Sequence, residues 1–319
     1  MNGMQGEQSI RMRAPVRQTQ MLRKWRRVFP LLTMSVPFFL LMVLFAYVPL
    51  WGWYIAFTNY YPGESILNAD IVGFRNFEQL FSGNQFLTAM RNTLVISAIG
   101  LLLSPLPMAF AILLNEVKQK WFAKIVQIVS SFPNFISWVI VYSIFFAFFS
   151  IDDGMINRLL FKLGLIEQPT DILTNADIAW WLQAAITNWK GLGWSAIIYI
   201  AAISSLDQEV FQAAEVDGAG RFRQIRHIMI PGLMPTYAVL FLLGIGYMLS
   251  SGFDQYYVFT NSVVHSKLDV LDTYVYNLGL VQLNFPFSTA AGIFKSVVSV
   301  VLVFTANWVY KMATGKSII

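Results

Sequence analysis

Cysteine is absent from the 319-residue sequence, and charged residues make up only 12% of it. Without thiols the chain cannot form a disulfide scaffold or a cysteine zinc site. A soluble domain carries about 25% charged residues, so half that amount is too little to cover the surface of a water-soluble globule. Hydrophobic residues reach 56%, which excludes intrinsic disorder, because disordered chains have low hydrophobicity and high charge. The composition indicates an integral membrane protein.

Long charge-free stretches locate the predicted membrane spans. Residues 28–63, 92–115 and 125–151 contain no charged side chain, and each stretch holds the ~20 residues that a helix needs to cross a bilayer. Three further apolar stretches are interrupted by a few polar residues. Buried helices of a soluble protein would show a polar stripe at a 3.6-residue period, which these runs lack. The predicted spans are 29–57, 92–114, 125–149, 179–203, 236–253 and 287–310.

Basic residues predict the orientation of this six-span, all-α membrane domain at 29–311. Lysine and arginine near span ends stay on the cytoplasmic side. Fifteen of them fall in the tail 1–28, in two loops and in residues 311–319, against five in the acidic outward segments. Both termini are therefore predicted to be cytoplasmic. The net charge of +5 is a signal of topology and not of nucleic-acid binding. Two lysines, Lys190 and Lys295, remain inside spans.

Groups that could carry catalysis or hold a metal are scarce. The two histidines, His227 and His265, fall on opposite sides of the membrane in this topology and cannot share a metal ion. No aspartate or glutamate lies deep in a span, which argues against a membrane enzyme and against a secondary transporter coupled to protons or sodium. Residues 191–196 match a dinucleotide fingerprint, but no strand is predicted before them. The chain is predicted not to be an enzyme.

The cytoplasmic segment 205–235 has the pattern of a short helix between two spans. Ser205 or Asp207 suits its first turn as a cap, and Gly218 or Gly220 suits its end. Such a helix, flanked by membrane spans on both sides, is held in one place on the cytoplasmic face. The segment is therefore a candidate for contact with a second protein.

The side chains of this short helix indicate how it would make contact. Val210, Phe211 and Ala214 are expected on one apolar face. A second amphipathic stretch with three arginines follows, and Pro231 and Pro235 are expected to break the chain before the fifth span. A narrow amphipathic helix of this kind is suited to docking. The alternative is an ordinary helix lying on lipid.

Resemblance to a known family rests first on this segment. Its residues and spacing resemble the EAA signature of permease subunits of binding-protein-dependent ABC importers, with the matching residues at 212–214, 217–219, 228, 230–231 and 235. Shorter matches resemble the carbohydrate branch of that family, and most of all its oligo- and polysaccharide permeases. They are YVPLWG at 47–52, GFRNF at 73–77, RNT at 91–93, WKG at 189–191 and YIAA at 199–202.

This resemblance implies a type I ABC importer permease fold with a cytoplasmic coupling helix, in the bacterial inner membrane. It also implies partners: a second, homologous permease subunit, two cytoplasmic ATPase subunits, an external solute-binding protein, a saccharide substrate and membrane lipid. No cofactor is expected in this chain, because ATP and magnesium would bind the ATPase subunits. Alternative functions are the import of another solute, such as amino acids or phosphate, and secondary transport.

The resemblance also assigns residues. The positions implied in coupling to the ATPase are Gln212, Ala213, Ala214, Asp217, Gly218, Ala219 and Pro231. At the first of these the family carries a glutamate, so the neutral amide loses the strength that a charge adds to a hydrogen bond.

A substrate pathway is predicted through the third to sixth spans. Ionisable residues at membrane depth are functional candidates, because burying them in lipid costs several kcal/mol. Two lysines facing the pathway would suit an acidic saccharide such as a uronate oligomer, and aromatic rings could stack on sugars. For the lysine in the fourth span the alternative is that its ammonium reaches the outer interface. The candidate pathway residues are Lys190, Trp194, Tyr199, Tyr247 and Lys295.

Overall fold

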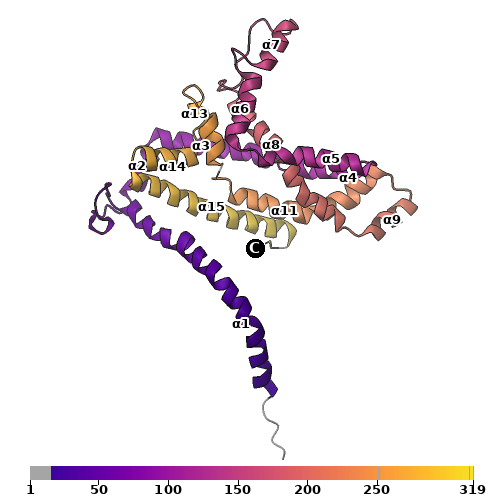
Figure 1. The fold of residues 1–319 in the computed structure, drawn as a ribbon, viewed down its shortest axis with the longest axis horizontal. Coiled ribbons are helices and arrows are strands. Elements are labelled where there is room, and N and C mark those ends of the chain that lie inside the picture. Colours follow the sequence, from indigo (N-terminus) through magenta and orange to yellow (C-terminus); the bar gives the residue numbers. More distant parts are fainter. Residues whose placement is uncertain (1–15, 251, 316, 319) are drawn as a thin grey trace, which may run out of the picture. The chain divides into compact units, whose positions relative to one another are not determined.

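The computed structural model describes residues 16–250, 252–315 and 317–318 (Figure 1). The predicted cytoplasmic tails therefore lie partly outside the described residues. Within them the chain is helical, and β-structure is limited to a single bridge between Thr58 and Ile71. The predicted all-α class is confirmed. The chain divides into two compact units, Met1–Tyr54 and Ile55–Ile319.

From residue 16 onward, the first unit is one long helical stretch. Helix α1 (Val16–Met42) continues through a π-helical turn, Val43–Tyr47, into a 3₁₀ stretch, Val48–Phe57. The part from Phe29 to Phe57 has a mean hydropathy of 2.3 and is long enough to cross a bilayer. A helix that is apolar on all sides is suited to lipid or to packing against other membrane helices.

Long helices of the second unit lie side by side (Figure 1). They are α3 (Asn84–Leu103), α4 (Leu106–Glu116), α8 (Ala179–Ser204), α11 (Ile230–Gly246) and α15 (Phe285–Thr314). Helix α8 contacts α3, α4 and α11, and α11 also packs on α15. Helix α8 is therefore the central element of this layer.

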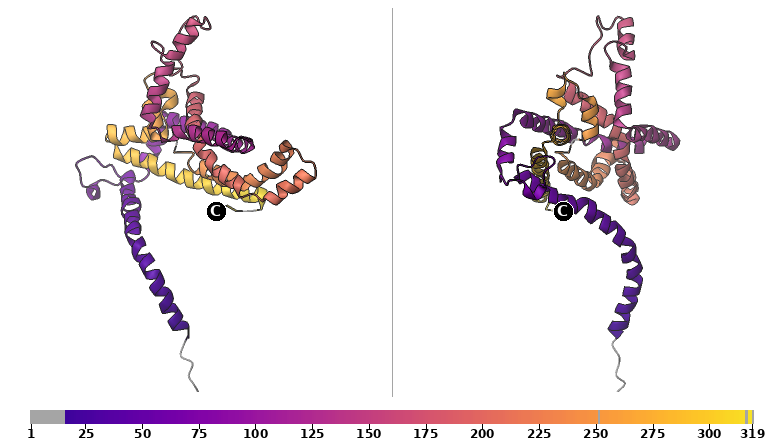
Figure 2. Two further views of the ribbon diagram at one scale, coloured as in Figure 1. Left: turned by 45° about the vertical axis from the view of Figure 1, so that its right-hand side comes forward. Right: turned by 60° about the vertical axis from the view of Figure 1, so that its left-hand side comes forward.

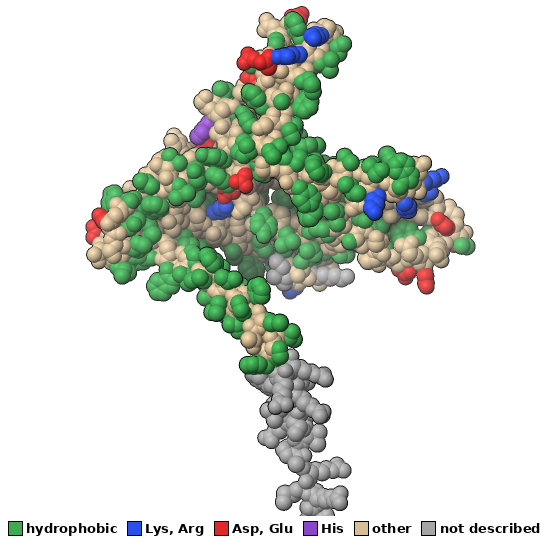
Figure 3. Space-filling view, viewed as in Figure 1, with side chains coloured by type: hydrophobic (Ala, Val, Ile, Leu, Met, Phe, Trp, Pro, Cys, Tyr) green, Lys and Arg blue, Asp and Glu red, His purple; other side chains and the backbone are tan. Residues whose placement is uncertain are grey.

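Short elements cover the ends of the layer. They are α2 (Arg75–Ser82), α7 (Met155–Lys162), α9 (Gln208–Val216), α12 (Phe253–Phe259), α13 (His265–Leu268) and α14 (Leu271–Tyr276), with a π-turn at Asn277–Val281. Helix α9 comes shortly after the C-terminal end of α8, and α13 packs near the N-terminal end of α8. We call these the coupling end and the far end of the layer. Charged side chains gather near α7, near α9 and in a small group at the middle of this view, and apolar side chains are spread over the surface between them (Figure 3).

Length and composition alone do not recover all six predicted spans. Among the described residues, four helical stretches are long and apolar enough to cross a membrane, or five if a bent pair is counted as one span. Helix α8, the predicted fourth span, has 26 residues, but it carries polar side chains such as Gln183, Asn188 and Lys190. These polar residues lower the mean hydropathy of α8, so composition alone does not mark it as a span. Gln183 and Lys190 are buried within the protein.

The predicted third span, 125–149, is not one straight helix. It is divided into α5 (Lys120–Ser131), a 3₁₀ turn at Phe132–Phe135 and α6 (Trp138–Phe149), with a bend of 106°. Pro133 has no N–H to donate, and the Ser137 hydroxyl accepts a bond from the Ile140 N–H and starts a new helix. Helix α6 therefore leaves the layer steeply and carries α7 at its tip (Figure 2).

The expectation that Pro231 and Pro235 break the chain is wrong. The backbone is continuously helical from α10 (Arg221–Gln224) through a π-turn, Ile225–Met229, into α11. A π-turn is a regular way for a helix to absorb a disrupted bond. The turn stands directly before Pro231, so the proline is accommodated and the helix continues to Gly246.

Candidate functional site

Helix α9 begins and ends as its residues predict. The Asp207 carboxylate accepts a hydrogen bond from the Glu209 N–H at 2.9 Å, so Asp207 is the cap. At the other end the Ala219 N–H donates to the Ala214 carbonyl at 2.8 Å. This closing turn needs a left-handed residue, and Gly218 supplies it with φ of 73°. The short helix is thus defined by its own sequence.

One face of α9 packs on the layer and the other is exposed. Phe211 packs against the apolar cluster formed by α4, α8 and α11. Val210 is 47% exposed and Val216 is 88% exposed, and Gln212 and Ala213 are exposed as well. The expectation that Val210 shares the face of Phe211 is therefore wrong. A partly apolar surface faces away from the layer.

Contacts on both sides fix α9 to the layer. Arg221 pairs with Glu116 at the end of α4, with 3.6 Å between Nη1 and Oε2. Leu206 packs on α11 at Gly232, where an added Cβ would lie 2.7 Å from the leucine Cδ2. The residues that flank α9 thus attach it to both α4 and α11. The residues predicted for coupling fall in two elements: Gln212, Ala213, Ala214, Asp217, Gly218 and Ala219 on or directly after α9, and Pro231 in the first turn of α11.

A cavity of about 250 Å³ lies between α3, α8, α11 and α12. None of the described residues that line it is charged. One of its polar side chains, Tyr247, is a predicted pathway residue. The others were not predicted from the sequence, because single hydroxyls and amides on apolar helices have no distinguishing pattern. They include Ser97, Ser104, Thr187, Asn188 and Ser250.

Buried amides support one wall of this cavity. Gln255 in α12 donates to the Gln183 side-chain oxygen at 2.7 Å and accepts from the Thr187 hydroxyl at 2.9 Å. Both glutamines are almost fully buried, at 2% and 1% exposure. Satisfied buried polar groups make a wall rigid and fix its geometry. Thr187 is therefore held in a defined orientation at the cavity.

Of the five predicted pathway residues, Tyr247 alone lines this cavity. Trp194 packs edge to face on Phe135, with ring centroids 5.4 Å apart. Tyr199 is 3% exposed and lies in the apolar cluster beneath α9. The two lysines have other partners.

Lys190 is buried at the bend between α5 and α6. Its ammonium donates to the carbonyl oxygens of Pro133 at 3.1 Å and Asn134 at 2.8 Å, and lies 5.2 Å from the centroid of the Trp138 ring. Only 8% of the residue is exposed, so its ammonium does not reach an interface. The lysine satisfies carbonyls that the helix break leaves free.

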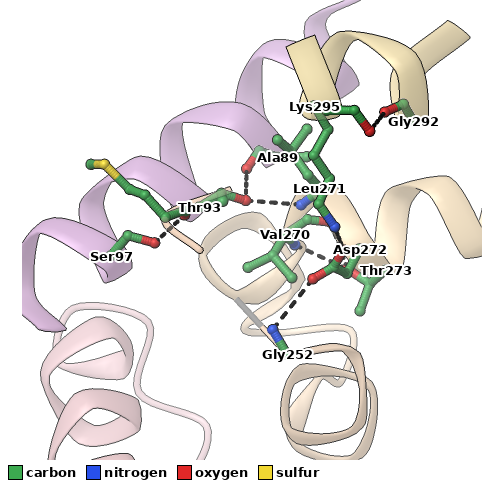
Figure 4. Close-up of polar contacts among 12 residues, drawn as sticks. Ala89, Thr93, Ser97, Gly252, Val270, Leu271, Asp272, Thr273, Gly292 and Lys295 are labelled. Carbon is green, nitrogen blue, oxygen red and sulfur yellow. Dashed lines mark hydrogen bonds and ion pairs between the residues drawn. The ribbon is translucent and has the colours of Figure 1, made fainter. Parts of the chain in front are cut away.

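Lys295 is paired with the carboxylate of Asp272 in α14 (Figure 4). Asp272 also accepts from the Gly252 N–H at 3.3 Å, which joins α14, α15 and the start of α12. On the other side of α14 the Leu271 N–H donates to the Thr93 hydroxyl at 2.9 Å. The carboxylate comes from a segment outside the predicted spans, so the pairing was not expected.

Comparison with known proteins defines the class. The family model for "binding-protein-dependent transport system inner membrane component" matches residues 104–314. The chain belongs to this family and is a membrane permease component.

Individual relatives within this family can be compared with the chain by sequence and by structure. The chain is 41% identical over 280 residues to protein LplB of Bacillus subtilis (strain 168), covering 86% of each. It is 40% identical over 277 residues to that organism's polygalacturonan/rhamnogalacturonan transport system permease protein YteP, covering 86% and 85%. A crystal structure of a bacterial alginate ABC transporter, bound to a periplasmic protein carrying an alginate pentasaccharide, matches with a TM-score of 0.84. That match has 33% identity and covers 93% of this chain and 99% of the other.

Proposed function

We infer that this chain is one of two permease subunits of an ATP-driven importer that carries oligo- or polysaccharides, acidic ones in particular, across the bacterial inner membrane. The carrying observation is α9, an exposed helix attached to α4 and to α11, and α11 lines the cavity. Relatives whose names include a polygalacturonan and an alginate transport system support the substrate class. Both termini lie in the cytoplasm in this proposal.

Partner subunits complete the importer. Two ATPase subunits bind and hydrolyse ATP with magnesium, and one of them receives α9. A second permease forms the pathway together with this chain, and an external binding protein delivers the saccharide. The exposed surface of Val210, Ala213 and Val216 suits a cleft lined by apolar side chains, since its burial is favourable. Gln212 contributes a neutral hydrogen bond at the rim.

Coupling follows from the attachments of α9. When the ATPases close, α9 moves and takes α4 along through Arg221 and Glu116, and α11 along through Leu206 and Gly232. Such a change is a rigid-body switch between two packings. Helix α11 lines the cavity, so the movement changes the shape of the cavity and opens it to one side of the membrane at a time.

Sugar hydroxyls would be met in the cavity by the neutral side chains already there. Hydroxyls and amides both donate and accept, as sugars do. Tyr247, 70% exposed, offers a ring and a hydroxyl at the cavity edge. Trp194, Tyr199 and the two lysines remain predictions as pathway residues, and their present contacts favour a role in packing.

The test is a bulky substitution on the exposed face of α9 in the complex reconstituted in proteoliposomes. We expect Ala213→Trp to lower ATP-dependent uptake of a galacturonate trimer about tenfold or more, because overpacking an interface costs about 1–3 kcal/mol. The control is Ala313→Trp, also exposed, in the last turn of α15. Normal uptake with Ala213→Trp would remove the docking assignment, and uptake of amino acids or phosphate in place of the saccharide would change the substrate class.

A further inference from the structure

Two cations meet one indole ring at the far end of the helix layer. Trp180 lies in the first turn of α8, and its ring centroid is 4.2 Å from the Lys267 ammonium and 5.8 Å from the Arg91 guanidinium carbon. The three residues come from α8, α13 and α3. Attraction to the ring face offsets part of the repulsion between two like charges. We call these residues the cation pair and its indole.

Hydrogen bonds hold this group in place. The Trp180 Nε1–H donates to the Lys267 carbonyl at 2.8 Å, and Arg91 donates to the Ser266 carbonyl at 3.1 Å. Asn92, fully buried, donates to the carbonyls of Ser266 and Asp269 at 3.1 and 2.9 Å. Helix α13 is thus fastened to α3 and α8, and the cation pair is preorganised rather than a chance meeting of two mobile side chains.

The charge of the pair is not balanced by a carboxylate. Within the described part of the chain, no ion pair within 4 Å involves Arg91 or Lys267. The nearby Asp269 is buried and directed to the Thr273 hydroxyl at 2.7 Å and to His265 at 3.9 Å. Burial raises the pKa of Asp269, while Thr273 and His265 act in the opposite direction. Two unbalanced cations are a ready partner for an anion.

The indole that contacts the cation pair lies on the same face of α8 as residues that line the cavity. Trp180, Ala184, Thr187 and Asn188 follow the spacing i, i+4, i+7 and i+8, so they share one face of α8. The last three line the cavity. Trp180 also packs on the apolar cluster containing Ile96 and Tyr256, and both of these line the cavity too. Helix α8 has 26 residues and spans about 39 Å, so the pair lies across the membrane from α9.

We propose that Arg91 and Lys267, held by Trp180, form the entrance site at which the importer recognises the carboxylates of an acidic saccharide. The proposal rests on the proposed function for the side of the membrane and the direction of transport. Arginine binds carboxylates in a fork geometry and lysine as a point charge. Charge is thus recognised at the entrance, and the neutral cavity beyond it receives the hydroxyls that acidic and neutral sugars share. Arg91 is exposed, and Lys267 is half-buried beside the half-buried ring, so both charges are open to an approaching ligand.

A cysteine probe tests the site without requiring transport. The chain has no native cysteine, so Ser266→Cys places a single thiol in this chain beside the pair, and Ser65→Cys places one in an exposed loop as the control. Modification by a maleimide-polyethylene glycol is followed by the shift of this chain on a gel, using the purified complex. We expect galacturonate trimer to slow modification at position 266 and not at 65. The methyl-esterified trimer, which has the same rings without the charge, should not protect.

Removing the pair should remove the protection. With Arg91→Gln and Lys267→Gln together, we expect the half-protecting concentration of the trimer to rise about tenfold or more, because charged hydrogen bonds are lost. Lys162→Gln, at the exposed end of α7, is the matched loss of one positive charge elsewhere. Equal protection by trimer and ester, protection that survives the double substitution, or no protection at all would each overturn the proposal.

Uptake separates this proposal from docking of the binding protein and from the proposed function itself. The double substitution should lower uptake of the acidic trimer and spare a neutral oligosaccharide delivered by the same complex. Equal losses for both would assign the pair to the binding protein and overturn the saccharide site. Normal acidic uptake by the double variant, without protection, would overturn the entrance site and leave the importer function standing.

Discussion

Lys190 in α8 and Lys295 in α15 are cations inside long helices, and they are held in opposite ways. The ammonium of Lys190 has neutral partners, two main-chain carbonyl oxygens and one indole ring. That of Lys295 is paired with the carboxylate of Asp272. An ion away from water is costly unless it is paired or hydrogen-bonded. A helix break can therefore replace a counter-ion, because it frees carbonyl oxygens.

The two arrangements should also respond differently to mutation. Asp272 is a side chain, so both members of its ion pair can be replaced together. The partners of Lys190 belong to the main chain at the bend and cannot be removed by substitution. Replacing Asp272 should therefore restore the stability that is lost when Lys295 is replaced. No second substitution can do the same for Lys190.

The largest effect is expected from Lys190→Met. It leaves two buried carbonyl oxygens without their donor, at about 1–3 kcal/mol each, and the bend between α5 and α6 loses its fastening to α8. We expect a marked fall in the thermal unfolding midpoint of the purified complex and loss of uptake for acidic and neutral saccharides alike. Lys162→Met at the exposed end of α7 is the control. An unchanged midpoint would contradict the assigned role of Lys190.

Gly193→Ala tests the same bend one helical turn further along α8. An added Cβ would lie 2.3 Å from the Ser130 carbonyl carbon, so α5 and α8 would have to move apart, at about 1–3 kcal/mol. Gly191→Ala is the matched control, because nothing lies within 4 Å of its added Cβ. It should stabilise α8 by about 0.5–1 kcal/mol. Opposite shifts of the unfolding midpoint support close packing at the bend, and equal shifts contradict it.

At the second lysine we predict a loss and a rescue. Lys295→Met leaves Asp272 without its cation and should cost about 1–2 kcal/mol, less than for a fully buried pair because both side chains are partly exposed. Adding Asp272→Met should return the unfolding midpoint close to that of the unmodified chain. Acidic and neutral saccharides should be affected equally. A selective loss of acidic uptake would instead place Lys295 on the substrate pathway.

Much of the coupling end could be predicted from the sequence. The Asp207 cap and the left-handed Gly218 act on their own neighbours in the chain, so the bounds of α9 followed from local chemistry. The charge-free stretches likewise predicted the membrane class. In each of these cases the signal lies within one short stretch of the sequence.

The lysine sites and the cation pair could not be predicted in this way. Lys190 binds carbonyls 56 and 57 residues earlier in the chain, and main-chain acceptors carry no residue signature. The helix through Pro231 was missed because prolines are tolerated when a π-turn precedes them. Arg91, Trp180 and Lys267 meet through the fold alone, and each looked like an ordinary residue near a span end.

The smallest effect is expected from Trp138→Leu, which tests whether the indole ring helps to hold the Lys190 ammonium. The substitution keeps an apolar side chain but removes the ring face 5.2 Å from the ammonium. A cation–π contact of this kind contributes about 0.5–2 kcal/mol. The coupling is measured by combining Trp138→Leu with Lys190→Met, and we expect the double variant to be less destabilised than the sum of the two single variants. Strict additivity would mean that the two carbonyl oxygens alone hold the charge, and that the break replaces the counter-ion without help from the ring.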